Sequence, residues 1–193
     1  MGVTAENLDD DEDLYPQVDL DWMTIKSSDV NAVVNALKLE NLQQGTFGDF
    51  GDTSNTFVFP AQKDWIIIIH EWEPRGSSAE YLNAMQQIVT ELSQEFGEAQ
   101  SFAAYEDIIY YTHWILGRNG FLIRSFAKAS ETDLFLNFGE VTEAESFINW
   151  TNEELFPGMP EVIQISKRWS TEPIFSNHPS DVVGVLGYKH LQP

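Results

Sequence analysis

Cysteine is absent from this chain of 193 residues. Its absence excludes disulfides, cysteine-based zinc sites and a cysteine nucleophile. The N-terminal residues also lack the basic and then apolar segments of a secretion signal, so we expect a cytoplasmic protein. Long hydrophobic runs are missing as well: Trp65–Ile69, the longest, is far too short to cross a bilayer.

Basic residues are scarce. Ten Lys and Arg stand against 31 Asp and Glu, which gives a net charge of −21. The net charge of a small soluble domain usually has a magnitude of roughly 2–8. Six of the acids lie between Glu6 and Asp13, so the rest of the chain still carries −15. Such a surface repels nucleic acid and anionic lipid and attracts basic proteins. The simpler alternative is that the charge only keeps the protein soluble.

Familiar catalytic motifs are missing too. We find no G-x-S-x-G, no P-loop and no dinucleotide fingerprint. Of the four histidines, only His70 and His113 fall on expected strands, where they could meet across a sheet close to Glu71. Without a recognisable ligand spacing, each is more simply a hydrogen-bonded sheet histidine. The sequence therefore predicts no catalytic residue, no metal and no cofactor.

The chain length and its 42% hydrophobic content suit one domain with a substantial core. We expect residues 1–15 to be a mobile acidic leader and residues 16–193 to form this domain. Its organising stretch is a hairpin over residues 107–129, in which Asn119-Gly120 separates two apolar runs. The first run, Ile108–Leu116, is apolar on both alternating faces, which is typical of a central strand covered on both sides.

The clearest helix signal is the capping box Ser77–Glu80, followed by apolar residues at three- and four-residue steps. It predicts a helix over residues 78–96, ended by Gly97 at positive φ. Gly45 is expected in a tolerant loop. Further helices are expected at 29–39, from Thr142 to near Trp150, and at about 160–169. The pattern predicts an α+β fold: a single domain with a mainly antiparallel sheet and three to four packed helices.

The hairpin also suggests an alternative to a pure binding protein. A simple two-residue turn would place Ile115 opposite Arg124 and His113 opposite Phe126. Four polar side chains would then share one face: Tyr111, His113, Arg124 and Lys128. With His70 nearby, this face would give a small enzyme of unknown class a polar site near His70, His113 and Arg124.

Aromatic residues among acids suggest a different kind of site. Trp72 stands between Glu71 and Glu73, and Tyr105 precedes two acids. Packing inside the domain would explain these aromatics, and a contact surface for a basic protein is the alternative. On the second reading, Trp72 is the anchor and the partner-binding residues are Asp49, Asp52, Glu71, Trp72, Glu73, Glu106 and Asp107.

A set of landmarks between Thr56 and Pro173 resembles a family. They are Phe57-Val58-Phe59-Pro60, Asp64-Trp65, Leu92-Ser93, Phe96-Gly97-Glu98, Tyr111-Thr112-His113-Trp114, Asn119-Gly120 with Arg124, Gly139-Glu140 with Thr142 and Glu145, and Trp169-Ser170 with Pro173. They look like those of small acidic bacterial immunity proteins, which accompany polymorphic or contact-delivered toxins. The resemblance implies a non-enzymatic inhibitor that binds one cognate toxin in the cytoplasm, and a nuclease with a basic cleft is one such toxin. An adaptor for another basic protein remains an alternative.

Overall fold

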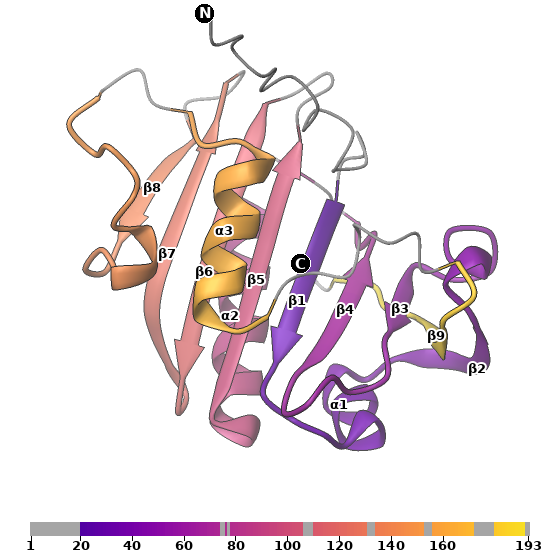
Figure 1. The fold of residues 1–193 in the computed structure, drawn as a ribbon. Coiled ribbons are helices and arrows are strands. Elements are labelled where there is room, and N and C mark those ends of the chain that lie inside the picture. The colour runs from indigo at the N-terminus through magenta and orange to yellow at the C-terminus, as the bar shows by residue number, and fades with distance from the viewer. Residues whose placement is uncertain are drawn as a thin grey trace, which may run out of the picture.

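The computed structural model describes residues 20–73, 76, 78–105, 110–130, 134–152, 156–171 and 180–191. Within them, one nine-stranded antiparallel sheet runs in the order β2-β9-β3-β4-β1-β5-β6-β7-β8 (Figure 1). The strands are β1 (Leu20–Ile25), β2 (Glu40–Thr46), β3 (Thr56–Val58), β4 (Ile66–His70), β5 (Glu98–Tyr105), β6 (Tyr111–Arg118), β7 (Phe121–Ala129), β8 (Phe135–Phe138) and β9 (Val183–Tyr188). The expected α+β fold with a mainly antiparallel sheet is confirmed.

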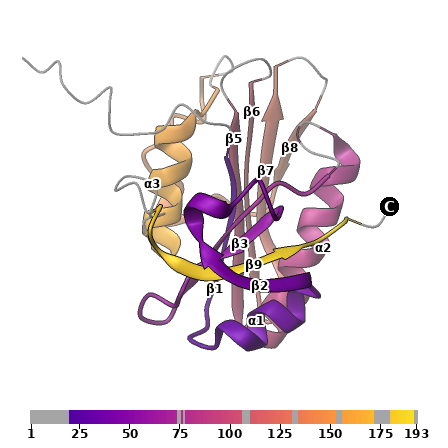
Figure 2. The same ribbon diagram turned by 90° about the vertical axis from the view of Figure 1, so that its right-hand side faces the viewer.

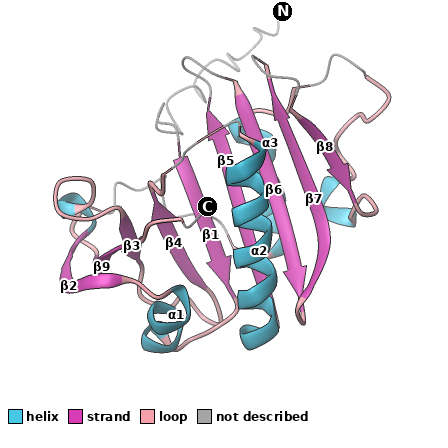
Figure 3. Ribbon diagram, turned by 180° about the vertical axis from the view of Figure 1, so that it is seen from behind, coloured by secondary structure: helices cyan, strands magenta, loops and turns pink. Residues whose placement is uncertain are grey.

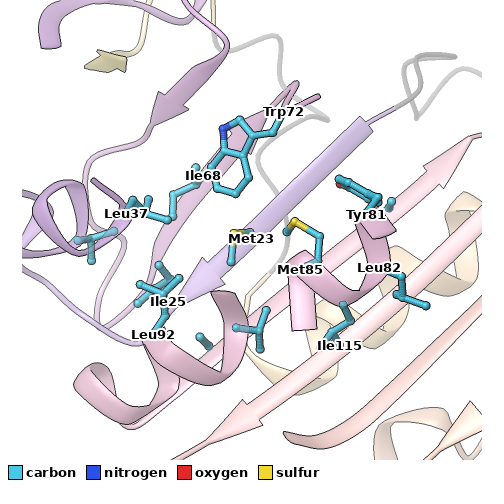
Figure 4. Packing of buried hydrophobic residues seen from close by; sticks show 14 of the residues in the cluster. Met23, Ile25, Leu37, Ile68, Trp72, Tyr81, Leu82, Met85, Leu92 and Ile115 are labelled. Atoms are coloured by element: carbon cyan, nitrogen blue, oxygen red, sulfur yellow. The ribbon is translucent and has the colours of Figure 1, made fainter. Parts of the chain in front are cut away.

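Helices cover both faces of the sheet. Helices α1 (Val30–Leu37) and α2 (Ala79–Phe96) lie on one face, and α3 (Met159–Trp169) lies on the other (Figures 2 and 3). Each face of the sheet carries its own hydrophobic core, and successive side chains of β1 point alternately into one core and the other. Met23 points into the α1/α2 core, which Figure 4 shows, and Trp22 points into the α3 core. We call these sides of the sheet the α2 face and the α3 face.

Local signals explain where α2 begins and ends. The Ser78 hydroxyl accepts a hydrogen bond from the amide of Tyr81 at 3.1 Å, one residue later than the expected cap at Ser77. Gly97 ends the helix with φ at +85°, as predicted. Close packing fixes α2 against β6: a Cβ on Gly117 would lie 2.8 Å from the carbonyl oxygen of Val89. A glycine at this point therefore lets helix and sheet approach closely.

The hairpin of β6 and β7 has the expected turn but not the expected register. Asn119 and Gly120 both have positive φ, at 49° and 80°. An irregularity at Ile123 then shifts the pairing, so that Leu116 lies opposite Arg124. A one-residue shift sends every later side chain to the other face. The expected polar face was therefore wrong, because Arg124 points to the α3 face and His113 to the α2 face.

The position of β6 also differs from expectation. Its first seven residues are buried, with α2 on one face and α3 on the other, so the expectation of cover on both sides is confirmed. The middle strand, however, is β1, which lies between β4 and β5. The strand that follows the leader thus occupies the centre of the sheet.

Several smaller predictions need correction. The helix expected at 29–39 is the shorter α1, which Asp29 caps by accepting a 3.0 Å hydrogen bond from the Ala32 amide. The segment after Thr142 forms only the 3₁₀ turn η2 (Glu143–Glu145). Gly45 belongs to β2 and not to a loop, and a Cβ there would lie 2.4 Å from Leu186 Cδ1, so the Leu186 side chain would have to move. The acidic leader, residues 1–15, lies outside the described residues. Within the part of the chain that is described, no helix is long and apolar enough to span a membrane.

Candidate partner-binding surface

Strand directions bring most of the predicted binding residues to one edge of the sheet. This edge is formed by the ends of several strands and not by an outer strand. β4 and β5 both run antiparallel to β1, so they end at the same edge, and β3 begins there. The amide of Glu71, just after β4, donates to the carbonyl of Asn55, just before β3, at 2.9 Å. This bond joins the loop of Asp52 to the segment of Glu71 and Glu73. We call these three residues the acidic edge.

Asp49 lies in the same loop but has a structural task. It ends the 3₁₀ turn η1 (Phe47–Asp49), and its carboxylate accepts hydrogen bonds from the amide and the hydroxyl of Thr46, both at 2.8 Å. These bonds favour the ionised form and lower the pKa of Asp49. The Asp49 carboxylate thus caps the 3₁₀ turn, so a substitution of Asp49 would disturb the loop itself.

Trp72 is not the exposed anchor that the sequence suggested. Its side chain is 0% exposed and stacks on His70 with ring centroids 3.9 Å apart. The indole N–H donates to the Thr56 hydroxyl at 2.7 Å. The prediction was wrong because the period-two alternation of β4 continues past its end, so Ile68, His70 and Trp72 all point to the α2 face. That alternation is visible in the sequence and would have placed Trp72 inside.

A different aromatic residue is exposed near this edge. Tyr110 immediately precedes β6, which begins where β5 ends, and it is 52% exposed. Its ring lies 6.1 Å from that of Phe156 in an edge-on arrangement, and its carbonyl accepts a 2.8 Å bond from Ser130. Tyr110 is therefore held in place while half of its surface stays accessible. The other two predicted residues, Glu106 and Asp107, lie outside the described residues.

The two histidines of the enzyme alternative lie in one row but not together. The register places His70 beside Asp21 of β1, Asp21 beside Ala103 of β5, and Ala103 beside His113. Two strands therefore separate the histidines, and Arg124 lies on the opposite face. The three residues do not converge on one site. Among the described residues, no group of three or more His, Asp or Glu could hold a metal ion.

The row is instead a buried polar network. The Asp21 carboxylate is 1% exposed and accepts hydrogen bonds from the hydroxyls of Tyr81, at 2.7 Å, and Tyr105. The imidazole of His113 lies 2.9 Å from the hydroxyls of both Tyr111 and Ser101. Burial lowers the pKa of His113 to about 3, so the ring is neutral at physiological pH. This network orders the core beneath the acidic edge.

A second buried network occupies the α3 face. Arg124 and Glu145 are both 0% exposed and form an ion pair at 2.8 Å. Arg124 Nη1 donates to the Asn137 side chain at 2.6 Å and to the Phe138 carbonyl at 2.9 Å. Glu145 accepts from the indole N–H of Trp114 at 3.0 Å. The pair thus ties η2 to β7 and β8, and its groups are occupied by these structural contacts.

Two pockets that open to solvent lie away from the acidic edge. The larger, of about 580 Å³, lies between η2, the end of α3 and the end of β6 and includes Arg118 and Arg168. Both arginines already bind protein groups: Arg118 pairs with Glu98 at 2.9 Å, and Arg168 donates to the Ala144 carbonyl at 3.3 Å. The smaller, of about 260 Å³, lies between α1 and α2. Neither pocket contains a residue of the acidic edge.

The comparisons with known proteins are negative. No protein-family model, no curated protein and no solved structure matches this chain.

Proposed function

We propose that this protein is an immunity-type inhibitor that binds a basic toxin through the acidic edge. The observation that supports this proposal is the joining of separate acidic segments at one edge of a rigid sheet. Asp52 and Glu73 are exposed and Glu71 is half-buried, and the Asn55–Glu71 bond holds their segments together. The chain that precedes β1 carries seven more acids in its sequence, and β1 begins at the same edge.

In this proposal, electrostatic attraction sets the association rate and packing of anchor residues sets the affinity. Charges at the edge act over a Debye length of about 8 Å at physiological salt and mainly speed association. Affinity comes instead from desolvated anchors, which are enriched in aromatic residues. Tyr110 fits this role because it is exposed, held by Phe156 and followed by a buried strand. It replaces Trp72 as the candidate anchor.

The experiment begins with co-purification of the protein with the product of the neighbouring gene. Association and dissociation rates are then measured by surface plasmon resonance at low and high salt. The test variant is Asp52→Lys/Glu71→Lys/Glu73→Lys. The control carries the same charge change away from this edge: Asp64→Lys, in the β3–β4 loop, with Glu91→Lys and Glu95→Lys, in the second half of α2.

We expect the acidic-edge variant to associate several-fold more slowly than the control and with a smaller salt dependence, while circular dichroism confirms that both variants are folded. Tyr110→Ala should raise the dissociation rate at least tenfold, which corresponds to roughly 1.4 kcal/mol or more. Equal association rates for the two triple variants would refute the acidic edge as the interface. Protection of cells without a measurable complex would refute the inhibitor and favour the enzyme alternative.

A further inference from the structure

The two outer strands of the sheet differ in how they are protected. β2 carries Glu40, has Asn41 at a φ of +52° and contains an irregularity between Glu40 and Gln43. Charges and bulges of this kind prevent an edge strand from pairing with another chain. β8, with the sequence Phe-Leu-Asn-Phe, has no charge, no proline and no such irregularity in its pairing with β7. Only its shortness limits pairing.

Exposed apolar side chains gather beside β8. Five of the eight large hydrophobic residues that are exposed in the described structure lie on β7, on β8 or just after it: Phe121, Ile123, Phe135, Phe138 and Val141. Phe121 and Phe135 are 71% and 62% exposed. Because a fully exposed aromatic side chain offers about 200 Å², the five together expose on the order of 500 Å². They do not form a single patch, because Phe135 lies on the α3 face beside Phe126, whereas Phe138 pairs with Ser125 and lies on the α2 face. The exposed aromatic rings on both sides of β8 are nevertheless available to a strand that pairs with it.

We propose that β8 pairs with β8 of a second copy of this chain in antiparallel fashion, so that the sheet continues across a twofold axis. The net charge of −21 on each copy opposes self-association, so a second copy can approach most closely at a strand that carries no charge, as β8 does. The acidic edge would attract a basic protein, whereas β8 presents no charge to it. β8 is also the outermost strand on the side away from β3 and β4, so self-pairing keeps the two acidic edges apart.

The hydrogen bonds to β7 define the register of this pairing. The amide of Ala129 donates to the carbonyl of Leu134 at 3.1 Å, so the alternation of an antiparallel ladder also directs the backbone groups of Leu136 toward β7. The backbone groups of Phe135 and Asn137 therefore point to the free side of β8. A twofold axis at Leu136 pairs Phe135 with Asn137 of the second copy and leaves Leu136 opposite Leu136 of the second copy.

The size of the surface predicts a weak dimer. Burial of all five side chains, about 500 Å² on each copy, would give roughly 1,000 Å² in total, the lower limit for a specific interface, and pairing through β8 alone buries less. We therefore expect a concentration-dependent dimer with a micromolar dissociation constant. The acidic edge and Tyr110 stay accessible in it, so toxin binding and self-association are independent.

Sedimentation velocity from about 1 to 200 µM tests the proposal. The wild type should shift from monomer to dimer over this range. Phe135→Lys/Phe138→Lys should remain monomeric with an unchanged melting temperature, because both side chains are exposed. Leu42→Lys is the matched control, since Leu42 is 49% exposed on the opposite outer strand, and it should dimerise like the wild type. A wild type that stays monomeric at 200 µM, or a dimer lost through Leu42→Lys instead, would overturn the proposal.

Crosslinking tests the register independently of affinity. Because the chain has no cysteine, Leu136→Cys introduces a single thiol. Residues in a non-hydrogen-bonded antiparallel pair have Cα atoms about 4.5 Å apart, within the range for a disulfide. Mild oxidation should therefore convert Leu136→Cys to a covalent dimer at least tenfold faster than Leu42→Cys. Equal rates for the two variants would refute β8 self-pairing, while circular dichroism confirms that both are folded.

Discussion

Breaking the ion pair between Arg124 and Glu145 should destabilise the protein strongly. Glu145 accepts hydrogen bonds from Arg124 Nε and Nη2, at 2.9 and 2.8 Å, and from the indole N–H of Trp114. The amide and hydroxyl of Thr142 add two more, at 2.9 and 2.8 Å. With both side chains fully buried, neither charge can turn to water when its partner is removed.

The expected magnitude follows from this burial. Arg124→Met leaves a buried carboxylate with neutral donors only, and Glu145→Gln leaves a buried guanidinium without its anion. Losing one partner of a buried pair costs about 3–5 kcal/mol, whereas removing both charges costs far less than the sum. The double variant should therefore reveal a coupling free energy of at least about 2 kcal/mol.

Urea unfolding, followed by circular dichroism, gives the free energies for this double-mutant cycle. The control cycle uses Arg118→Met and Glu98→Gln, because Arg118 and Glu98 form an ion pair of similar length, 2.9 Å, in which the Arg118 side chain is 46% exposed. Coupling in this exposed pair should stay below about 1 kcal/mol. Equal coupling in the two cycles, or single variants at Arg124 and Glu145 that each lose under 1 kcal/mol, would refute the argument from burial.

Two further predictions concern the α2 face. The folded protein holds the pKa of His113 at about 3, below its ordinary value of 6.5, so neutral His113 contributes stability above pH 6.5 that is lost as the pH falls toward 3. Between pH 6.5 and 3, the free energy of unfolding of the wild type should thus fall by up to about 1.4 kcal/mol per pH unit more than that of His113→Gln. Urea midpoints that fall in parallel for the two proteins would contradict this. Gly117→Ala should cost roughly 1–3 kcal/mol because its Cβ would meet the Val89 carbonyl, whereas Gly48→Ala, with its nearest contact at 3.4 Å, should cost under 0.5 kcal/mol. Similar thermal unfolding of these two glycine variants would argue against the tight packing of α2.

Elements with strong local signals were predictable from the sequence. The Asn119-Gly120 turn and the end of α2 at Gly97 both follow from positive φ, and the structure has both. The register of the hairpin was not predictable, because the irregularity at Ile123 has no local mark. Its cause is tertiary: the shift brings Arg124 to the α3 face, where Glu145 and Asn137 bind its guanidinium.

The candidate site shows a similar division. Acidic residues flanking Trp72 suggested an exposed position, but burial depends on the period of the strand and not on the charge of neighbours. Tyr110 and Tyr111 are adjacent and identical in type, and only the boundary of β6 decides that the first is exposed and the second buried. Joining Asp52 to Glu71 and Glu73 requires the pairing of β3 with β4, a tertiary contact that the charges of these residues do not indicate.

The position of β9 has a consequence for the order of folding during synthesis. β9 is made after every other described strand, yet it lies between β2 and β3, pairing Leu186 with Gln43 on one side and with Phe57 on the other. β2 has no other neighbour in the sheet. While the ribosome is still making the intervening chain, β2 therefore has no described strand to pair with, and the backbone groups of β3 that pair with β9 have no partner strand. We therefore expect this side of the sheet to form last, once residues 183–188 have left the ribosome, and an incomplete chain to be prone to wrong strand pairing until then.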